Sequence, residues 1–182
     1  CQRLRAWAWT ERRRGRSGVR DFKRQLQAFL HDPARGVMGD CYRTALACVL
    51  GVDRDLVPHT HADLTGQEHL DETGAWLHSQ GLRRIVIPVH ATTLEEVATI
   101  HTRSDGLPLI VTGCGPRHTN HVVVVYGPHD IWCPILGEVA PEVALLGPAR
   151  PTDYFWAEWI VKKPGNIKIA APAQTDEPEL PL

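Results

Sequence analysis

Apolar side chains recur at helical spacing through much of the first half of the chain. A single amphipathic helix over Val19–His31 is predicted from the repeat of Val19, Phe22, Leu26, Phe29 and Leu30. A second apolar run starts at Cys41 and stops at Gly51, the residue type that most often ends helices. The helical segments predicted in chain order are Val19–His31, Cys41–Leu50, the short turn Asp53–Val57, Gln67–Gln80 and a capped helix from Thr93 to about His101.

The second half of the chain changes to short runs of β-branched and aromatic residues between turn signals, which predict strands. These strands are Arg84–Val89, Leu107–Thr112, His121–Tyr126, Ile131–Ile135 and Tyr154–Val161. Helices followed by an antiparallel sheet predict one α+β domain over residues 19–163. Residues 1–18 are expected to form a partly disordered basic arm, and residues 164–182 an extended tail rich in proline and acidic side chains.

Length and charge limit the classes of function. The 182 residues suffice for one domain with a full core, and a net charge of −1 indicates neither a nucleic-acid-binding nor a membrane-binding protein as a whole. Residues 1–20 nevertheless carry seven arginines against the single acid Glu11, so this arm is either solvated or a contact for an acidic partner or nucleic acid. No apolar run reaches the roughly 18–20 residues that span a bilayer, so no membrane association is expected.

The cysteines direct attention to Cys41. There are five cysteines without a CxxC pair, which favours a reducing, cytoplasmic compartment over a disulfide framework. Cys41 opens an apolar helix, where the dipole and free N–H groups favour the nucleophilic thiolate. His121, at the start of a buried strand, is the best candidate for the base that such a thiol needs. The competing interpretation is a cysteine that packs as a small hydrophobic residue, and nothing around Cys1 supports an N-terminal nucleophile.

Other residue types that could carry chemistry are less specific. His59 and His61, with His69, offer metal ligands, but no carboxylate or cysteine completes a known spacing. Surface or capping roles are therefore favoured for these histidines, and neither a metal nor a cofactor is expected. We interpret Trp132, Trp156 and Trp159 as sheet packing rather than a platform for a ligand.

Two separated segments carry a resemblance to a known group. The first is the run Gly39–Gly51, which reads GDCYRTALACVLG, followed by Val57-Pro58-His59; the second is the run Cys114–Val124, which reads CGPRHTNHVVV. They resemble the two signatures of a group of papain-like proteins from phages and bacteria that are related to the C39-like cysteine peptidases. The resemblance covers about residues 37–136. It implies a papain-like α+β fold with Cys41 as the nucleophile and His121 as the base.

The third member of the catalytic set departs from the group's pattern. An aspartate that orients the imidazole is expected on the next strand, but Cys133 stands there, twelve residues after His121. A thiol is a weak acceptor and orients an imidazole poorly. Asp130 lies in the turn, roughly 20 Å along the hairpin from His121 at about 3.3 Å per residue, so it cannot replace the aspartate.

The oxyanion hole is also incomplete in sequence. Papain-like enzymes place a glutamine several residues before the cysteine, and Ala34–Met38 contains none. Gln25 and Gln27 lie too far upstream to be assigned by spacing. The backbone N–H of Cys41 can still donate, because amides at a helix start point toward a forming oxyanion.

The sequence therefore predicts a papain-like cysteine hydrolase, a peptidase or amidase, that acts on a peptide or protein substrate by acyl transfer. Its catalytic residues would be Cys41 and His121, with Cys133 in the orienting position. The alternatives are a catalytically degenerate papain-fold protein that binds a partner, or a structural component of a phage. Intact Cys41 and His121 favour the enzyme, whereas Cys133 and the absent glutamine favour degeneration.

Overall fold

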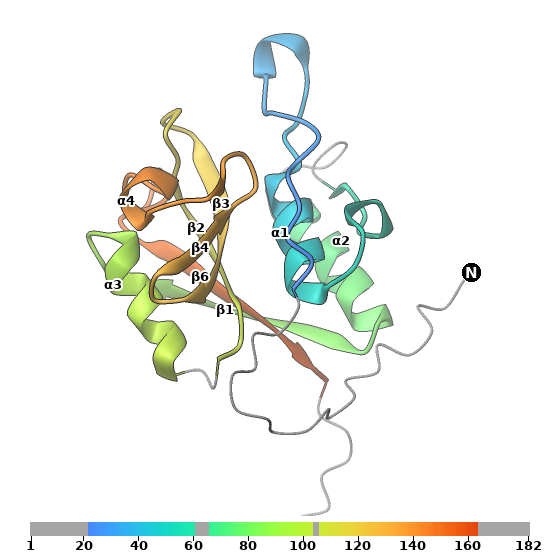
Figure 1. The fold of residues 1–182 in the computed structure, drawn as a ribbon. Helices are drawn as coiled ribbons and strands as arrows, with labels where there is room; N and C mark the ends of the chain where they lie inside the picture. Colours follow the sequence, from blue (N-terminus) through green and yellow to red (C-terminus); the bar gives the residue numbers. More distant parts are fainter. Residues whose placement is uncertain (1–21, 61–65, 104–105, 164–182) are drawn as a thin grey trace, which may run out of the picture.

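The computed structural model describes residues 22–60, 66–103 and 106–163. Within them the chain forms an α+β domain in which helices pack on both faces of a six-stranded sheet (Figure 1). The predicted fold class is confirmed at this level. The predictions for the basic arm and the tail lie outside the described residues.

Every neighbouring pair of strands in the sheet is antiparallel, and the spatial order is β1-β6-β2-β3-β4-β5. The strands are β1 (Leu82–Val89), β2 (Leu109–Cys114), β3 (Asn120–Gly127), β4 (Asp130–Cys133), β5 (Gly137–Glu138) and β6 (Phe155–Lys162). Five of them correspond to the predicted strands. The two-residue β5 is too short to leave a sequence pattern.

The helices also follow the predicted pattern from Cys41 onward. They are α1 (Cys41–Leu50), α2 (Gly66–Ser79), α3 (Leu94–Ala98) and α4 (Pro141–Ala144), with 3₁₀ turns at Pro33–Arg35, Arg54–Leu56 and Thr99–Arg103. Gly51 ends α1 with a left-handed φ of 68°, and Thr93 and Glu96 form the predicted capping box of α3. The four-residue α4 was not predicted, because one helical turn carries no periodic signal.

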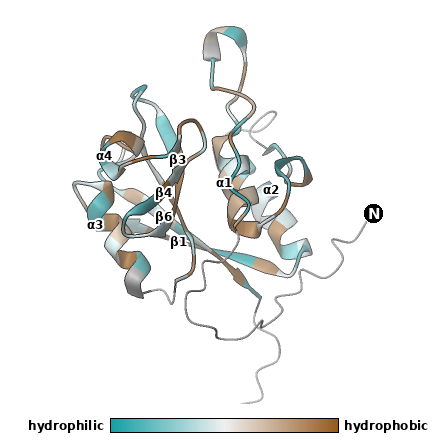
Figure 2. Cartoon of the chain, viewed as in Figure 1, coloured by the Kyte–Doolittle hydropathy of each residue, from teal (hydrophilic) through white to brown (hydrophobic). Residues whose placement is uncertain are grey.

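The two faces of the sheet have separate hydrophobic cores. Because side chains alternate along a strand, Val122 and Val124 of β3 pack under α1, whereas Val123 and Val125 pack under α3 and α4. Figure 1 shows α1 and α2 on one side of the sheet and α3 and α4 on the other. Figure 2 shows that α1 is the more hydrophobic of the first pair, as its burial requires.

The predicted helix over Val19–His31 is wrong for its described part. Residues 22–31, which we call the N-terminal strap, contain no helix and run in an extended course along the domain. Arg24 N donates to the Phe22 oxygen within the strap, whereas the N–H groups of Gln25, Gln27, Ala28 and Phe29 bond to the domain. Gln25 N donates to the Cys48 sulfur at 3.3 Å and Gln27 N to the Pro134 oxygen at 2.8 Å. These tertiary bonds outweigh a local helical pattern whose apolar side chains Leu26, Phe29 and Leu30 stay largely exposed.

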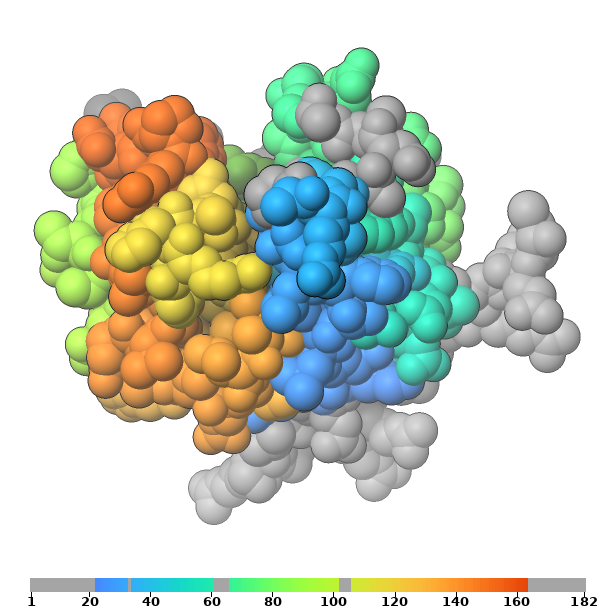
Figure 3. All heavy atoms as spheres, turned by 90° about the horizontal axis from the view of Figure 1, so that it is seen from above, coloured from blue at the N-terminus to red at the C-terminus, as the bar shows by residue number. Residues whose placement is uncertain are grey.

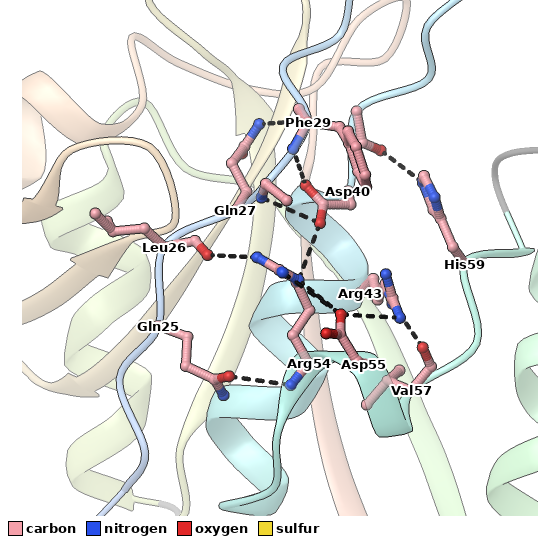
Figure 4. A network of polar contacts seen from close by, with 12 residues as sticks. Gln25, Leu26, Gln27, Phe29, Asp40, Arg43, Arg54, Asp55, Val57 and His59 are labelled. Carbon is pink, nitrogen blue, oxygen red and sulfur yellow. Dashed lines mark hydrogen bonds and ion pairs between the residues drawn. The ribbon is translucent and has the colours of Figure 1, made fainter.

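Asp40 holds the strap against the start of α1. Its buried carboxylate accepts the N–H groups of Ala28 at 3.2 Å and Phe29 at 2.9 Å, and Arg54 Nε lies 3.4 Å away (Figure 4). Asp40 N donates in turn to the Phe29 oxygen, while Asp32 and Val37 pair between them. Residues 30–39 therefore form a loop, an excursion from the domain whose two ends meet where Phe29 and Asp40 are hydrogen-bonded.

Replacing Asp40 by alanine is expected to lower the free energy of unfolding by about 3 kcal/mol. The change leaves two backbone N–H groups and a guanidinium without their buried acceptor. The matched control is Asp53→Ala, which removes an exposed carboxylate paired with Lys23 and should cost less than about 1 kcal/mol. Urea titrations of both variants measure the free energy of unfolding. Equal decreases in the two variants would contradict the role given to Asp40.

Candidate active site

Cys41 is the first residue of α1 and is partly exposed. The backbone N–H of Val122, near the start of β3, is directed at its thiol, as are N–H groups of the first turn of α1. The helix-start position that the sequence predicts is thus present. The thiol lies beside the same strand that carries His121.

Burial nevertheless raises the pKa of the Cys41 thiol to about 11. The N–H groups at the helix start and at Val122 lower it, but by less than desolvation raises it, and the neighbouring negative charge of Asp40 raises it further. The helix start therefore does not by itself produce a thiolate here. At neutral pH Cys41 is a thiol.

His121 and Cys133 are brought together, as the family resemblance implied. Both side chains are buried, and His121 Nε2 lies 3.3 Å from Cys133 Sγ. They project from neighbouring strands β3 and β4 on the face that α3 and α4 cover. Cys133 thus occupies the place in which an orienting acceptor would stand.

The surroundings of His121 keep its imidazole neutral. Burial, with a smaller contribution from the positive charge of Arg117, lowers the pKa of His121 to about 4. The thiol of Cys133, whose own pKa burial raises, supplies no negative charge to oppose this effect. His121 is therefore a weak base in this structure.

Cys41 and His121 are close in the fold but not hydrogen-bonded to each other. The imidazole makes its hydrogen bond through Nε2, to Cys133, and Nδ1 makes none to the described residues. The thiol of Cys41 is approached by the N–H of Val122, the residue that follows His121. Within the described residues Nδ1 is therefore the ring nitrogen without a hydrogen bond.

Two polar neighbours considered from sequence have other partners. Asp130 pairs through its carboxylate with Arg24, with distances of 2.6 and 2.7 Å to the guanidinium nitrogen Nη2, at the turn end of the β3–β4 hairpin. Asn120 binds the backbone of Arg150 through both ends of its amide, each at 2.7 Å. Neither side chain is engaged with His121.

Gln27 is the residue that reasoning by spacing missed. It lies fourteen residues before Cys41, but the excursion of residues 30–39 brings the strap back to Asp40. Figure 4 shows Gln27 beside Phe29 and Asp40; its Nε2 donates to the Phe29 oxygen at 2.7 Å, and its buried Oε1 has no partner. The pairing of Asp32 with Val37 is the signal that would have shortened the apparent spacing.

His59 and His69 make hydrogen-bond contacts within the fold, and His61 lies outside the described residues. His69 is buried against Thr60 at 2.5 Å, and His59 Nε2 lies 3.4 Å from the Gly39 oxygen. Within residues 22–60, 66–103 and 106–163, no three histidine, cysteine or acidic side chains gather as metal ligands. Cys48 is buried in the core, and Cys114 is a buried free thiol. No helix in the described part of the chain is long and apolar enough to cross a membrane.

Comparison of the chain with protein-family models, with curated proteins and with solved structures finds no match. What the structure establishes is an α+β domain with Cys41 at the start of its first long helix and His121 beside Cys133. The family resemblance of the two signatures enters only as a hypothesis.

A carboxylate at position 133 is expected to raise the pKa of His121. In Cys133→Asp the new charge would lie in hydrogen-bond contact with Nε2 and should bring that pKa from about 4 to about 5–7. Cys133→Ser is the neutral control and should leave it near the wild-type value. NMR titration of the imidazole measures both, and an unchanged value in a folded Cys133→Asp protein would contradict the contact.

The same shift makes a prediction for stability. Because His121 titrates near pH 6.5 when unfolded and near 4 when folded, the unfolded chain binds the extra proton between these values. This contribution to stability is complete above pH 6.5 and is lost as the pH falls toward 4. In Cys133→Asp the folded pKa of His121 should lie closer to 6.5, so less stability should be lost between these values. Denaturant titrations at pH 7 and pH 5 should therefore show a smaller drop in the free energy of unfolding than in wild type.

Proposed function

We propose that this protein is a papain-like cysteine hydrolase that cleaves a peptide or amide bond by acyl transfer through Cys41. The observation that carries the proposal is the 3.3 Å contact between His121 Nε2 and Cys133 Sγ, with Cys41 next to the same strand. This contact occupies Nε2, so the proposal assigns the proton transfer to Nδ1. The two signatures that resemble the C39-like group add independent support.

The reaction would proceed in two balanced steps. Cys41 Sγ attacks the substrate carbonyl while its proton passes to His121 Nδ1, and His121 returns that proton to the departing amine as the thioester forms. Water then attacks the thioester with His121 as base, which releases the acid and restores the thiol. For Nδ1 to act as a base, Nε2 must carry the ring proton, and the Cys133 sulfur is its acceptor.

Two donors are available for the oxyanion. The backbone N–H of Cys41 lies at the start of α1, where amides point out of the helix. The second is the side-chain amide of Gln27, which the strap brings beside the residue that precedes Cys41. Release of its bond to the Phe29 oxygen would free Nε2 for a substrate.

The electrostatics of the site predict a slow enzyme. Cys41 and His121 are both uncharged at neutral pH, so proton transfer must accompany attack rather than precede it. In serine enzymes loss of the orienting carboxylate costs about 10⁴-fold in rate. With a thiol in that place, the reaction rate should lie between that of a full triad and that of a Cys–His pair without a third residue.

The second candidate function is a papain-fold protein that binds a partner without catalysis. The observation in its favour is the direction of the two pKa shifts, which move Cys41 and His121 away from an ion pair. An active hydrolase and a degenerate one differ in whether His121 accelerates the reaction of Cys41. That difference defines the experiment.

Acylation by p-nitrophenyl acetate tests the proposed enzyme. The wild-type protein should form an acetyl thioester on Cys41 and turn it over, and His121→Ala should slow both steps by about 10²-fold or more. Cys41→Ala should abolish them, whereas Cys114→Ala, which removes another thiol, should not. Mass spectrometry locates the acyl group. Equal rates in wild type and His121→Ala would reject the hydrolase and favour the binding protein.

Gln27→Ala is expected to lower the rate of acylation by about 10²-fold, the usual cost of one oxyanion donor. Gln25→Ala is the matched control, because the Gln25 side chain binds the backbone of Arg54 and Val52 and has no route to the substrate. It should lower stability but leave the rate per folded molecule unchanged. If the two variants lose activity equally, the role given to Gln27 is wrong.

A further inference from the structure

One row of register partners runs across four strands of the sheet next to Cys41. Val122 of β3 pairs with Thr112 of β2, Thr112 with Trp156 of β6, and Trp156 with Pro88 of β1. Val122 packs under α1, so the side chains of this row project on the α1 face of the sheet. The row therefore runs from Val122, beside the Cys41 thiol, to β1, the strand at the edge of the sheet.

α1 covers the next row but leaves this one open. Tyr42, the second residue of α1, is buried, and its hydroxyl donates to Glu158 of β6 at 2.6 Å. Trp156 lies two residues before Glu158 on the same strand face, beyond the start of the helix, and is 37% exposed. Seen from above, the connection of β2 to β3 (yellow) lies next to the segment before α1 (blue) (Figure 3).

The open part of this face is apolar and aromatic. Pro88 is exposed beside Trp156, and the exposed Tyr154 stands edge-on to His90 with ring centroids 5.6 Å apart. The charge nearest along β6 is Glu158, which is buried and engaged by Tyr42 and, at 4.0 Å, by Arg84. A side chain resting here would meet the exposed part of the Trp156 indole, and the carboxylate of Glu158 is already engaged. The surface therefore suits an aromatic or branched apolar group and disfavours a charged one.

We infer that Trp156 is the floor of a specificity subsite for an aromatic or branched apolar side chain on the acyl side of the scissile bond. Trp156 is thus assigned a function beyond the sheet packing predicted from sequence, and the assignment rests on the proposed hydrolase. Adjacent strands lie about 4.8 Å apart, so Trp156 is about 10 Å from Val122. An extended peptide advances about 3.3 Å per residue, which places the bound side chain about three residues from the reacting carbonyl.

Two tetrapeptidyl chloromethyl ketones test the subsite. They differ only at the third residue from the ketone, Phe in one and Glu in the other, and each alkylates Cys41 as Sγ displaces chloride. Rates are divided by the iodoacetamide rate of the same protein, which cancels the reactivity of the thiol itself. The Phe reagent should react at least about tenfold faster in wild type, and Trp156→Ala should reduce the preference to within about twofold.

The control is Ile85→Ala, which removes a side chain that is 48% exposed on the opposite face of the sheet. It should leave the preference for Phe intact. A preference that survives Trp156→Ala, or that is absent in wild type, overturns the subsite while leaving the hydrolase standing.

Failure of the hydrolase is seen separately. If Cys41 reacts with no reagent, the proposed catalysis is rejected, and the subsite is then tested by NMR in Cys41→Ala. The corresponding Phe tetrapeptide amide should shift the Trp156 indole N–H resonance saturably, and the Glu peptide should not. No shift with the Phe peptide overturns the subsite as well.

Discussion

The buried carboxylate of Asp40 is the interaction on which the geometry of the site depends. The side chain of an aspartate before a helix ordinarily caps the first turn, but the Asp40 carboxylate accepts no hydrogen bond from α1 and binds the strap instead. These hydrogen bonds hold the strap as an extended segment and bring the chain back to the start of α1 after residues 30–39. They also place Gln27 beside Asp40. The same charge raises the pKa of Cys41. One residue thus assembles the surroundings of the thiol and opposes its ionisation.

The second constraint is the low polarity around the thiol and the imidazole. Burial removes water from around Cys41, His121 and Cys133, and it shifts each pKa in the direction that favours the uncharged form. A carboxylate at position 133 would raise the pKa of His121, because an opposite charge at hydrogen-bond distance favours the imidazolium. His121 and Cys133 are therefore in contact without the negative charge that a carboxylate would supply. The proposed chemistry follows from this: slow acyl transfer in which the proton moves together with attack.

The sequence predicted what local patterns determine. Gly51 ends α1 because a left-handed residue is needed there, and Thr93 with Glu96 starts α3 through a capping box. The contact of His121 with Cys133 followed from the alternation of a hairpin combined with the family resemblance. The helix predicted at Val19–His31 failed, because its N–H groups bond to Asp40, Cys48 and Pro134, which are distant in sequence. The position of Gln27 beside Asp40 could not be predicted for the same reason. The raised pKa of Cys41 could not be predicted because the start of a helix does not reveal how deeply a side chain is buried.

The central claim is that Cys41 and His121 are both uncharged at rest, because burial favours the neutral forms and position 133 holds a thiol rather than a carboxylate. The pH dependence of Cys41 alkylation by iodoacetamide, in wild type and in Cys133→Asp, measures this most directly. We predict that the wild-type rate stays low through neutral pH and rises only in the alkaline range, toward a thiol pKa of about 11. Cys133→Asp should react faster between pH 6 and 8. A wild-type rate already at a plateau below pH 7, unaffected by Cys133→Asp, would contradict the account.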